Sequence, residues 1–143
     1  FDYVPRVLSR NGVQELFHGL AMKPGKPTFL GRRGKVFVLG LPGNPVSTFV
    51  NFEIVAKALL ARLQGLPVER PAFRARLSAE VSRRTATDRV EFLPARLDSG
   101  VVTPLRYGGS SMLSALAQAN ALIRMEIGQT RMEKGSDIDV RPI

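Results

Sequence analysis

Two turns rich in proline and glycine, separated by a short apolar run, constrain the fold of this chain more than any other feature. The first turn reads Lys-Pro-Gly-Lys-Pro at residues 23–27, and the second reads Gly-Leu-Pro-Gly-Asn-Pro at residues 40–45. The apolar run at residues 36–39 is β-branched, too short for a helix and bounded by glycines, so it predicts a buried strand. The chain must then turn sharply where this strand ends.

A helix is predicted directly after the second turn. Asn44 can cap this helix, and Pro45 suits its first position because a missing N–H group costs nothing there. Apolar residues recur at helical spacing as far as residue 63, and Gly65 followed by Pro67 predicts the end. The helix therefore begins at the carboxyl end of a strand, where open α/β sheets bind ligands and where free N–H groups of a first helical turn favour an anion.

The first turn adds two cations near this predicted anion site. Lys23 and Lys26 are each followed by a proline that restricts the backbone, and Gly25 between them permits a close approach. Two lysines on a stiff loop near a helix start are typical of an oxyanion or phosphate site. Each turn by itself also fits a simpler interpretation, a solvated turn followed by an ordinary capped helix.

The remaining sequence predicts a short helix at residues 5–14, interrupted by Asn11-Gly12, and a strand at residues 16–22. Residues 1–65 thus resemble part of an α/β layer. From residue 68 onward the pattern changes to alternation, with Asp98-Ser99-Gly100 as a hairpin turn. Short strands are predicted at 73–82, 90–97, 101–107, 121–127 and 137–140, with one short helix at 111–119. Such a series suggests a small, partly closed β-barrel.

Composition limits the function classes. The chain has no cysteine, which excludes disulfides and thiolate metal sites, and no membrane span or signal peptide is visible, so the cytoplasm is the expected location. His18, the only histidine, is expected to be a packing or surface residue. The chain begins with Phe1 and not with Met, and it is therefore expected to be a piece of a longer polypeptide.

The formal charge of +9 raises the possibility of nucleic-acid binding. The basic excess is concentrated before residue 68, where nine basic and three acidic residues occur, against twelve and nine afterwards. No aromatic stacking pattern accompanies these charges, and tryptophan is absent. We therefore expect neither a nucleic-acid nor a membrane partner.

Two of these motifs, in their order and separation, resemble the MoeA family, the molybdopterin molybdenumtransferases that include the gephyrin E domain. They are Phe-His-Gly-Leu-Ala-Met-Lys-Pro-Gly-Lys-Pro-Thr at 17–28 and Gly-Leu-Pro-Gly-Asn-Pro-Val-Ser at 40–47. Gly-Gly-Ser-Ser-Met-Leu-Ser at 108–114, followed by Ala-Leu-Ile at 121–123, is similar to the family's C-terminal barrel. The resemblance implies the C-terminal part of a three-layer α/β molybdopterin-binding domain at residues 1–67 and a small β-barrel domain at residues 68–143.

The resemblance also implies an activity and its site. Family members take adenylylated molybdopterin and molybdate, insert molybdenum and release AMP in a reaction that needs a divalent cation, here Mg²⁺, and they work as homodimers. The residues that match family positions contacting molybdate are Lys23, Lys26 and Ser47, with Arg89 and Ser110 from the barrel. The residues that match the turns shaping the substrate site are Gly25, Pro42, Gly43, Asn44 and Pro45. Asp2 matches an acid that serves as a magnesium ligand or proton acceptor.

A second hypothesis comes from a different class of function. The same fold could be a non-catalytic interaction or scaffold module, as one branch of the family suggests, and loss of the catalytic acids upstream would favour it. The choice between molybdenum and tungsten as the metal that is inserted also stays open.

Overall fold

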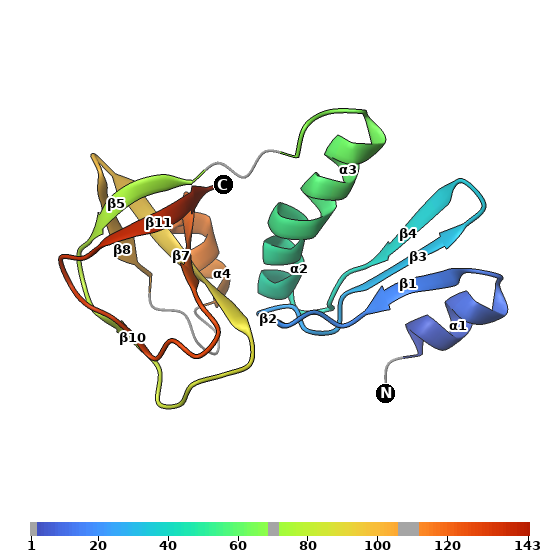
Figure 1. Cartoon of the computed structure of the whole chain (residues 1–143), viewed down its shortest axis with the longest axis horizontal. Coiled ribbons are helices and arrows are strands. Elements are labelled where there is room, and N and C mark those ends of the chain that lie inside the picture. Colours follow the sequence, from blue (N-terminus) through green and yellow to red (C-terminus); the bar gives the residue numbers. More distant parts are fainter. Residues whose placement is uncertain (1–2, 69–71, 106–111) are drawn as a thin grey trace.

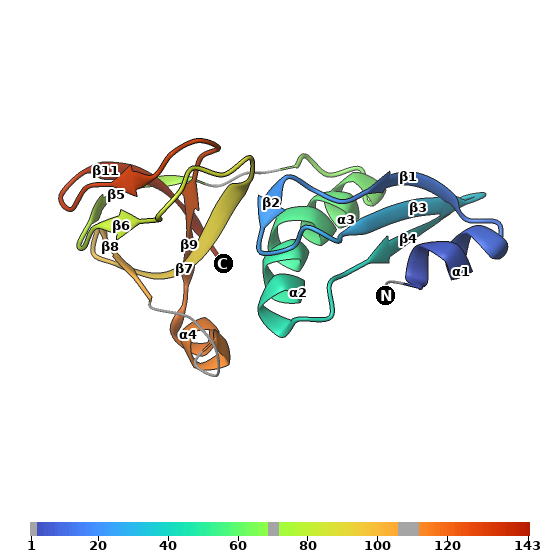
Figure 2. The same cartoon turned by 90° about the horizontal axis from the view of Figure 1, so that it is seen from below.

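A computed structural model describes residues 3–68, 72–105 and 112–143, which form two lobes side by side (Figure 1). One lobe contains a small sheet and the long central helix, and the other is a barrel of short strands. Figure 2 shows the same two lobes from below, with β2 between them. Asp2 and Ser110, two of the predicted site residues, lie outside the described residues.

The first lobe begins with α1 (Val4–Arg10), β1 (Gln14–His18) and β2 (Met22–Lys23). The helix predicted at 5–14 is shorter than expected, because Gly12, with φ of +75°, breaks it and Gln14 already belongs to β1. The strand predicted at 16–22 is in fact two strands, since Gly19 turns the chain at φ of +93°. The ring of His18 packs edge-on against that of Phe29 with centroids 6.0 Å apart.

The apolar run at residues 36–39 forms a strand, but the prediction that it is buried is wrong. It lies in β4 (Val36–Gly40), which pairs antiparallel with β3 (Phe29–Arg33), a strand that the sequence analysis missed. The sheet order is β1-β3-β4, so β4 is an edge strand of the described part of the chain. Val36 is consequently 61% exposed, and the rest of β4 is half-buried.

The central helix begins where it was predicted. It consists of α2 (Pro45–Asn51), the π-helical η1 (Phe52–Ala56) and α3 (Lys57–Leu63), and Gly65 with φ of +72° follows its end. Only its first half is well packed: Val46 and Val50 are buried, whereas Leu63 is 54% exposed. No helix among the described residues is long and apolar enough to cross a membrane.

The second lobe is a closed barrel, and not a partly closed one. Strand order runs β7-β8-β5-β11-β9, and β9 pairs with β7 to complete the circle. Ser99 and Gly100 both have positive φ in the predicted turn between β7 and β8. The strand predicted at 73–82 is interrupted and gives β5 and the separate β6. The elements are β5 (Phe73–Leu77), β6 (Val81–Ser82), β7 (Val90–Asp98), β8 (Val101–Pro104), α4 (Met112–Gln118), β9 (Ala121–Met125), β10 (Arg131–Met132) and β11 (Asp137–Pro142).

Strand β2 joins the two lobes. It runs parallel to the beginning of β7, with Met22 opposite Val90 and Lys23 opposite Glu91. An apolar cluster that includes Met22 of β2 contains residues from both lobes, among them Val50, Phe92 and Leu122. The turn that carries the lysines therefore starts directly on the edge of the barrel sheet.

Candidate oxyanion site

The first turn packs directly against the central helix. The buried side chain of Asn51 donates a hydrogen bond from Nδ2 to the Ser47 carbonyl at 2.8 Å and accepts one from the Thr28 hydroxyl. The Gly25 carbonyl lies 2.8 Å from the same hydroxyl and shares its single proton with Asn51. Asn51 and Thr28 are both fully buried, so these hydrogen bonds fix residues 25–28 against α2. The sequence analysis missed both residues, although a polar Asn inside an apolar helical stripe was a usable signal.

The second turn is held by the helix cap. The Asn44 Oδ1 atom accepts hydrogen bonds from the Val46 and Ser47 N–H groups at 3.0 and 3.2 Å, and the Thr48 hydroxyl donates to the Pro42 carbonyl. Thr48 N–H bonds to the Asn44 carbonyl, and Pro45 has no N–H. The expectation of free N–H groups in the first helical turn is therefore wrong. An anion near this end would instead meet the Ser47 hydroxyl and the helix dipole.

The two lysines of the first turn have different surroundings. The Lys23 ammonium lies 2.8 Å from the Oε1 atom of Glu91, whose side chain is only 8% exposed. Lys26 instead lines a pocket of about 450 Å³ together with Arg89, which comes from the barrel. The other lining residues are Gly19, Leu20, Ala21 and Asp88. The structure thus brings Lys26 and Arg89 from the two lobes to one pocket, whereas Lys23, Ser47 and residues 42–45 do not line it.

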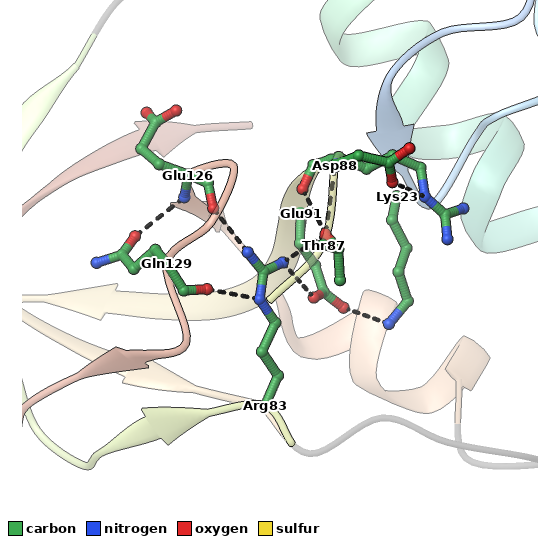
Figure 3. Close-up of polar contacts among 8 residues, drawn as sticks. Lys23, Arg83, Thr87, Asp88, Glu91, Glu126 and Gln129 are labelled. Atoms are coloured by element: carbon green, nitrogen blue, oxygen red, sulfur yellow. Dashed lines mark hydrogen bonds and ion pairs between the residues drawn. The ribbon is translucent and has the colours of Figure 1, made fainter. Parts of the chain in front are cut away.

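A network centred on Arg83 organises the barrel side of this region (Figure 3). The Arg83 guanidinium donates to the Gln129 carbonyl at 2.6 Å and the Glu126 carbonyl at 2.7 Å. It also donates to the Thr87 hydroxyl at 3.2 Å and lies 3.4 Å from Oε2 of Glu91. Glu91 therefore lies between two cations, Arg83 and Lys23.

Thr87 connects this network to Arg89. Its hydroxyl accepts from the Arg89 N–H at 3.2 Å and donates to the Arg89 carbonyl at 2.9 Å. The Arg89 side chain lies 3.7 Å from the exposed carboxylate of Asp88. The sequence analysis missed Arg83, Thr87 and Glu91; the acidic Glu91 between apolar neighbours in a barrel strand was the signal that could have revealed them.

The described residues offer no metal centre. Among residues 3–68, 72–105 and 112–143, no group of three or more His, Cys, Asp or Glu side chains could hold a metal ion. The predicted magnesium ligand, Asp2, lies outside these ranges. What the described residues can offer is cations and hydroxyls suited to an oxyanion.

Comparisons with known proteins agree with this two-lobed arrangement. Residues 1–62 match the family model of a probable molybdopterin binding domain, and residues 74–143 match that of the MoeA C-terminal region, domain IV. These matches define the class, an α/β domain of the probable molybdopterin-binding type followed by a small barrel. The chain belongs to the MoeA family.

One curated relative and one solved structure each cover nearly the whole chain. A molybdopterin molybdenumtransferase from Haemophilus influenzae is 30% identical over 99% of this chain, and one from Synechocystis is 52% identical over 35% of it. The crystal structure of a molybdopterin biosynthesis MoeA protein from Pyrococcus horikosii superposes with a TM-score of 0.81, at 27% identity over 96% of this chain. The chain covers 36%, 13% and 34% of these three proteins, so it spans about a third of their length or less.

Proposed function

We propose that this chain is the C-terminal part of an enzyme of molybdenum cofactor biosynthesis, and that it supplies the molybdate side of the active site. The reaction is the insertion of molybdenum from molybdate into adenylylated molybdopterin with release of AMP. Membership of the MoeA family and the name of its relatives, molybdopterin molybdenumtransferase, support this proposal. The observation that carries it is the pocket that Lys26 and Arg89 line from opposite lobes.

The chemistry of the substrate fits these side chains. Molybdate is a tetrahedral dianion that needs several charged donors, and a guanidinium can give two parallel hydrogen bonds to an oxyanion. We assign Lys26 and Arg89 to the direct binding of molybdate, with Lys23, which lies outside their pocket, as a further cation in the first turn. Ser47 and Ser110 would add hydroxyl donors.

The turns give the site its shape. Gly25 lets the backbone of the first turn lie against Asn51. The Asn44 cap fixes the helix start at Pro45, and the Thr48 hydroxyl donates to the Pro42 carbonyl across the turn that contains Gly43. Because these elements are fixed before a ligand arrives, little conformational entropy is lost on binding. The chain's own residues thus bind and orient the oxyanion.

Two parts of the proposal rest on the family resemblance alone: the magnesium ion with Asp2 as its ligand or as a proton acceptor, and the homodimer. The location in the cytoplasm is proposed from the sequence, in which no cysteine, membrane span or signal peptide is visible. We assign no chemical step to the metal, because the described residues do not supply its ligands.

The test is isothermal titration of the protein with molybdate. We expect Lys23→Ala and Lys26→Ala each to weaken binding by about tenfold, because each removes a cation that contacts or attracts the dianion. Lys35→Ala is the matched control, since Lys35 is an exposed lysine in the distant β3–β4 turn. Unchanged affinity in both site variants would count against the proposal.

The scaffold alternative makes a different prediction. If the fold serves only assembly, the full-length protein that contains this chain will release no AMP from adenylylated molybdopterin and molybdate, and the two lysine variants will bind molybdate as the unaltered protein does.

A further inference from the structure

Two predicted ligands on different lobes, Lys23 and Arg89, are connected through one group of buried and partly buried side chains. Glu91 contacts the Lys23 ammonium at 2.8 Å, Arg83 contacts Glu91, and Thr87 joins Arg83 to the backbone of Arg89. Figure 3 shows Arg83 between Glu91 and the segment that carries Glu126 and Gln129. Arg83 is 11% exposed and Glu91 is 8% exposed, so this is an interior network and not a pair of surface contacts.

We propose that Arg83 and Glu91 are positioning residues, which hold Lys23 and Arg89 in place for the oxyanion. For the identity of the ligand, this inference rests on the proposed function. Neither residue touches the pocket that Lys26 and Arg89 line, so they act through the cations that they orient.

The contact with Glu91 restricts the freedom of the Lys23 side chain. A lysine side chain loses much rotamer entropy when it is ordered, and a lysine with no partner must lose that entropy when it binds the ligand. Here the backbone of Lys23 lies opposite Glu91 in the β2–β7 pairing, and its ammonium is bound to the same residue. Both ends of the side chain are therefore fixed in advance.

Arg83 allows this arrangement to persist when an anion arrives. Removing a cation from a buried carboxylate is unfavourable if no second cation remains to compensate the negative charge. Glu91 keeps Arg83 as its second cation, and Arg83 is itself fixed by the carbonyls of residues 126 and 129. The Lys23 ammonium has three N–H donors, so it can stay on Glu91 and offer its other donors to a dianion, while Arg83 keeps Glu91 in place.

A charge effect of the opposite sign competes with this role. The carboxylate of Glu91 repels a dianion, so its removal could strengthen binding if only the charge mattered. Two variants separate the two effects. Glu91→Gln removes the charge and keeps the length, whereas Glu91→Asp keeps the charge and shortens the side chain by about 1.5 Å.

The decisive experiment titrates both variants with molybdate, with Glu80→Asp as the control. Glu80 forms a more exposed pair with Arg131 at 2.7 Å on the same barrel. We expect Glu91→Asp to weaken molybdate binding by about tenfold and the control to leave it unchanged. Unchanged affinity in Glu91→Asp, or tighter binding in Glu91→Gln with no change in Glu91→Asp, would overturn the proposal.

A second readout does not depend on molybdate. Partial acetylation with acetic anhydride, followed by mass spectrometry, measures how accessible each lysine amine is. We expect Lys23 to react several-fold faster in Glu91→Asp and Glu91→Gln than in the unaltered protein, with Lys35 as the internal standard. Equal Lys23 reactivity would overturn the proposal even if molybdate binding changed. Should the unaltered protein fail to bind molybdate, the proposed function fails, and this measurement still decides whether Glu91 positions Lys23.

A separate variant tests whether Thr87 connects Arg83 to Arg89. Thr87→Val removes the hydroxyl that joins Arg83 to Arg89 and leaves the Lys23–Glu91 pair intact. We expect weaker molybdate binding with unchanged Lys23 reactivity. Binding equal to that of the unaltered protein would show that Arg89 does not depend on this network and would overturn that half of the proposal.

Discussion

The backbone of Gly25 lies against the side-chain amide of Asn51 so closely that a Cβ atom at position 25 would come within 1.9 Å of Nδ2. Asn51 cannot move aside easily, because it is fully buried and bonded to Ser47 and Thr28. This contact joins the first turn to the helix that follows the second turn. Gly25 is thus required by the tertiary structure as well as by its own backbone, whose φ is +117°.

Gly25→Ala should therefore destabilise the protein by about 4 kcal/mol, from backbone strain, overlap and lost hydrogen bonds together. Urea denaturation followed by circular dichroism measures this loss. Gly34→Ala is the matched control, because Gly34 also has positive φ, +58°, but no atom lies within 4 Å of the added Cβ. We expect the control to lose only about 1 kcal/mol. Equal losses of unfolding free energy in the two variants would mean that the contact between Gly25 and Asn51 does not contribute to stability.

Thr28→Val tests the buried hydrogen bond between Thr28 and Asn51. The substitution keeps the shape of the side chain but leaves Asn51 Oδ1 without its donor, so we expect a loss of about 2 kcal/mol in the free energy of unfolding. Thr103→Val removes an exposed hydrogen bond of 2.9 Å to Ser78 and should cost less than about 0.5 kcal/mol. Equal costs for the two variants would contradict the role assigned to Asn51 and Thr28.

Asn44 combines a cap with a predicted place in the substrate site, and two variants separate these roles. Asn44→Ala should lower the free energy of unfolding by about 1 kcal/mol because Val46 and Ser47 lose their acceptor. Asn44→Asp keeps the cap and should preserve stability, but its negative charge should weaken molybdate binding. Thermal denaturation and titration of both variants check this. If Asn44→Asp binds molybdate normally, the helix start is not near the ligand.

Two ion pairs of the barrel have the same length but different burial. Arg83–Glu91 and Arg74–Asp139 both measure 3.4 Å, yet the former is 11% and 8% exposed and the latter 67% and 70%. Arg83→Met should cost about 3 kcal/mol because it leaves a buried carboxylate with one cation, and Arg74→Met should cost less than about 0.5 kcal/mol because water screens the pair. Chemical denaturation of both variants gives the comparison. A small loss in Arg83→Met would show that Lys23 alone compensates Glu91.

Several features were predictable from the sequence because neighbouring residues create them. Asn44 and Pro45 define the start of a helix through one side chain and the two N–H groups next to it. Ser99-Gly100 joins β7 to β8 through a local turn. The alternation beyond residue 72 indicated barrel strands for the same reason, although it did not predict where β5 would end.

Other features depend on residues that are distant in the sequence. Nothing near Lys23 indicates that its ammonium will lie against Glu91, because that contact exists only once β2 has paired with β7. The exposure of β4 likewise follows from its place at the edge of a sheet with β3, and not from its apolar composition.

The sequence by itself therefore determined the two motifs, the helix start, the barrel strands and the excess of positive charge. The tertiary structure decided how those charges are used: Lys26 shares a pocket with Arg89, while Lys23 binds a buried carboxylate of the other lobe. The physical reason is the separation in the sequence between the groups that interact. Caps, turns and periodicity arise from groups a few residues apart, whereas the partner and burial of a charged side chain depend on which segments pack together when the chain folds.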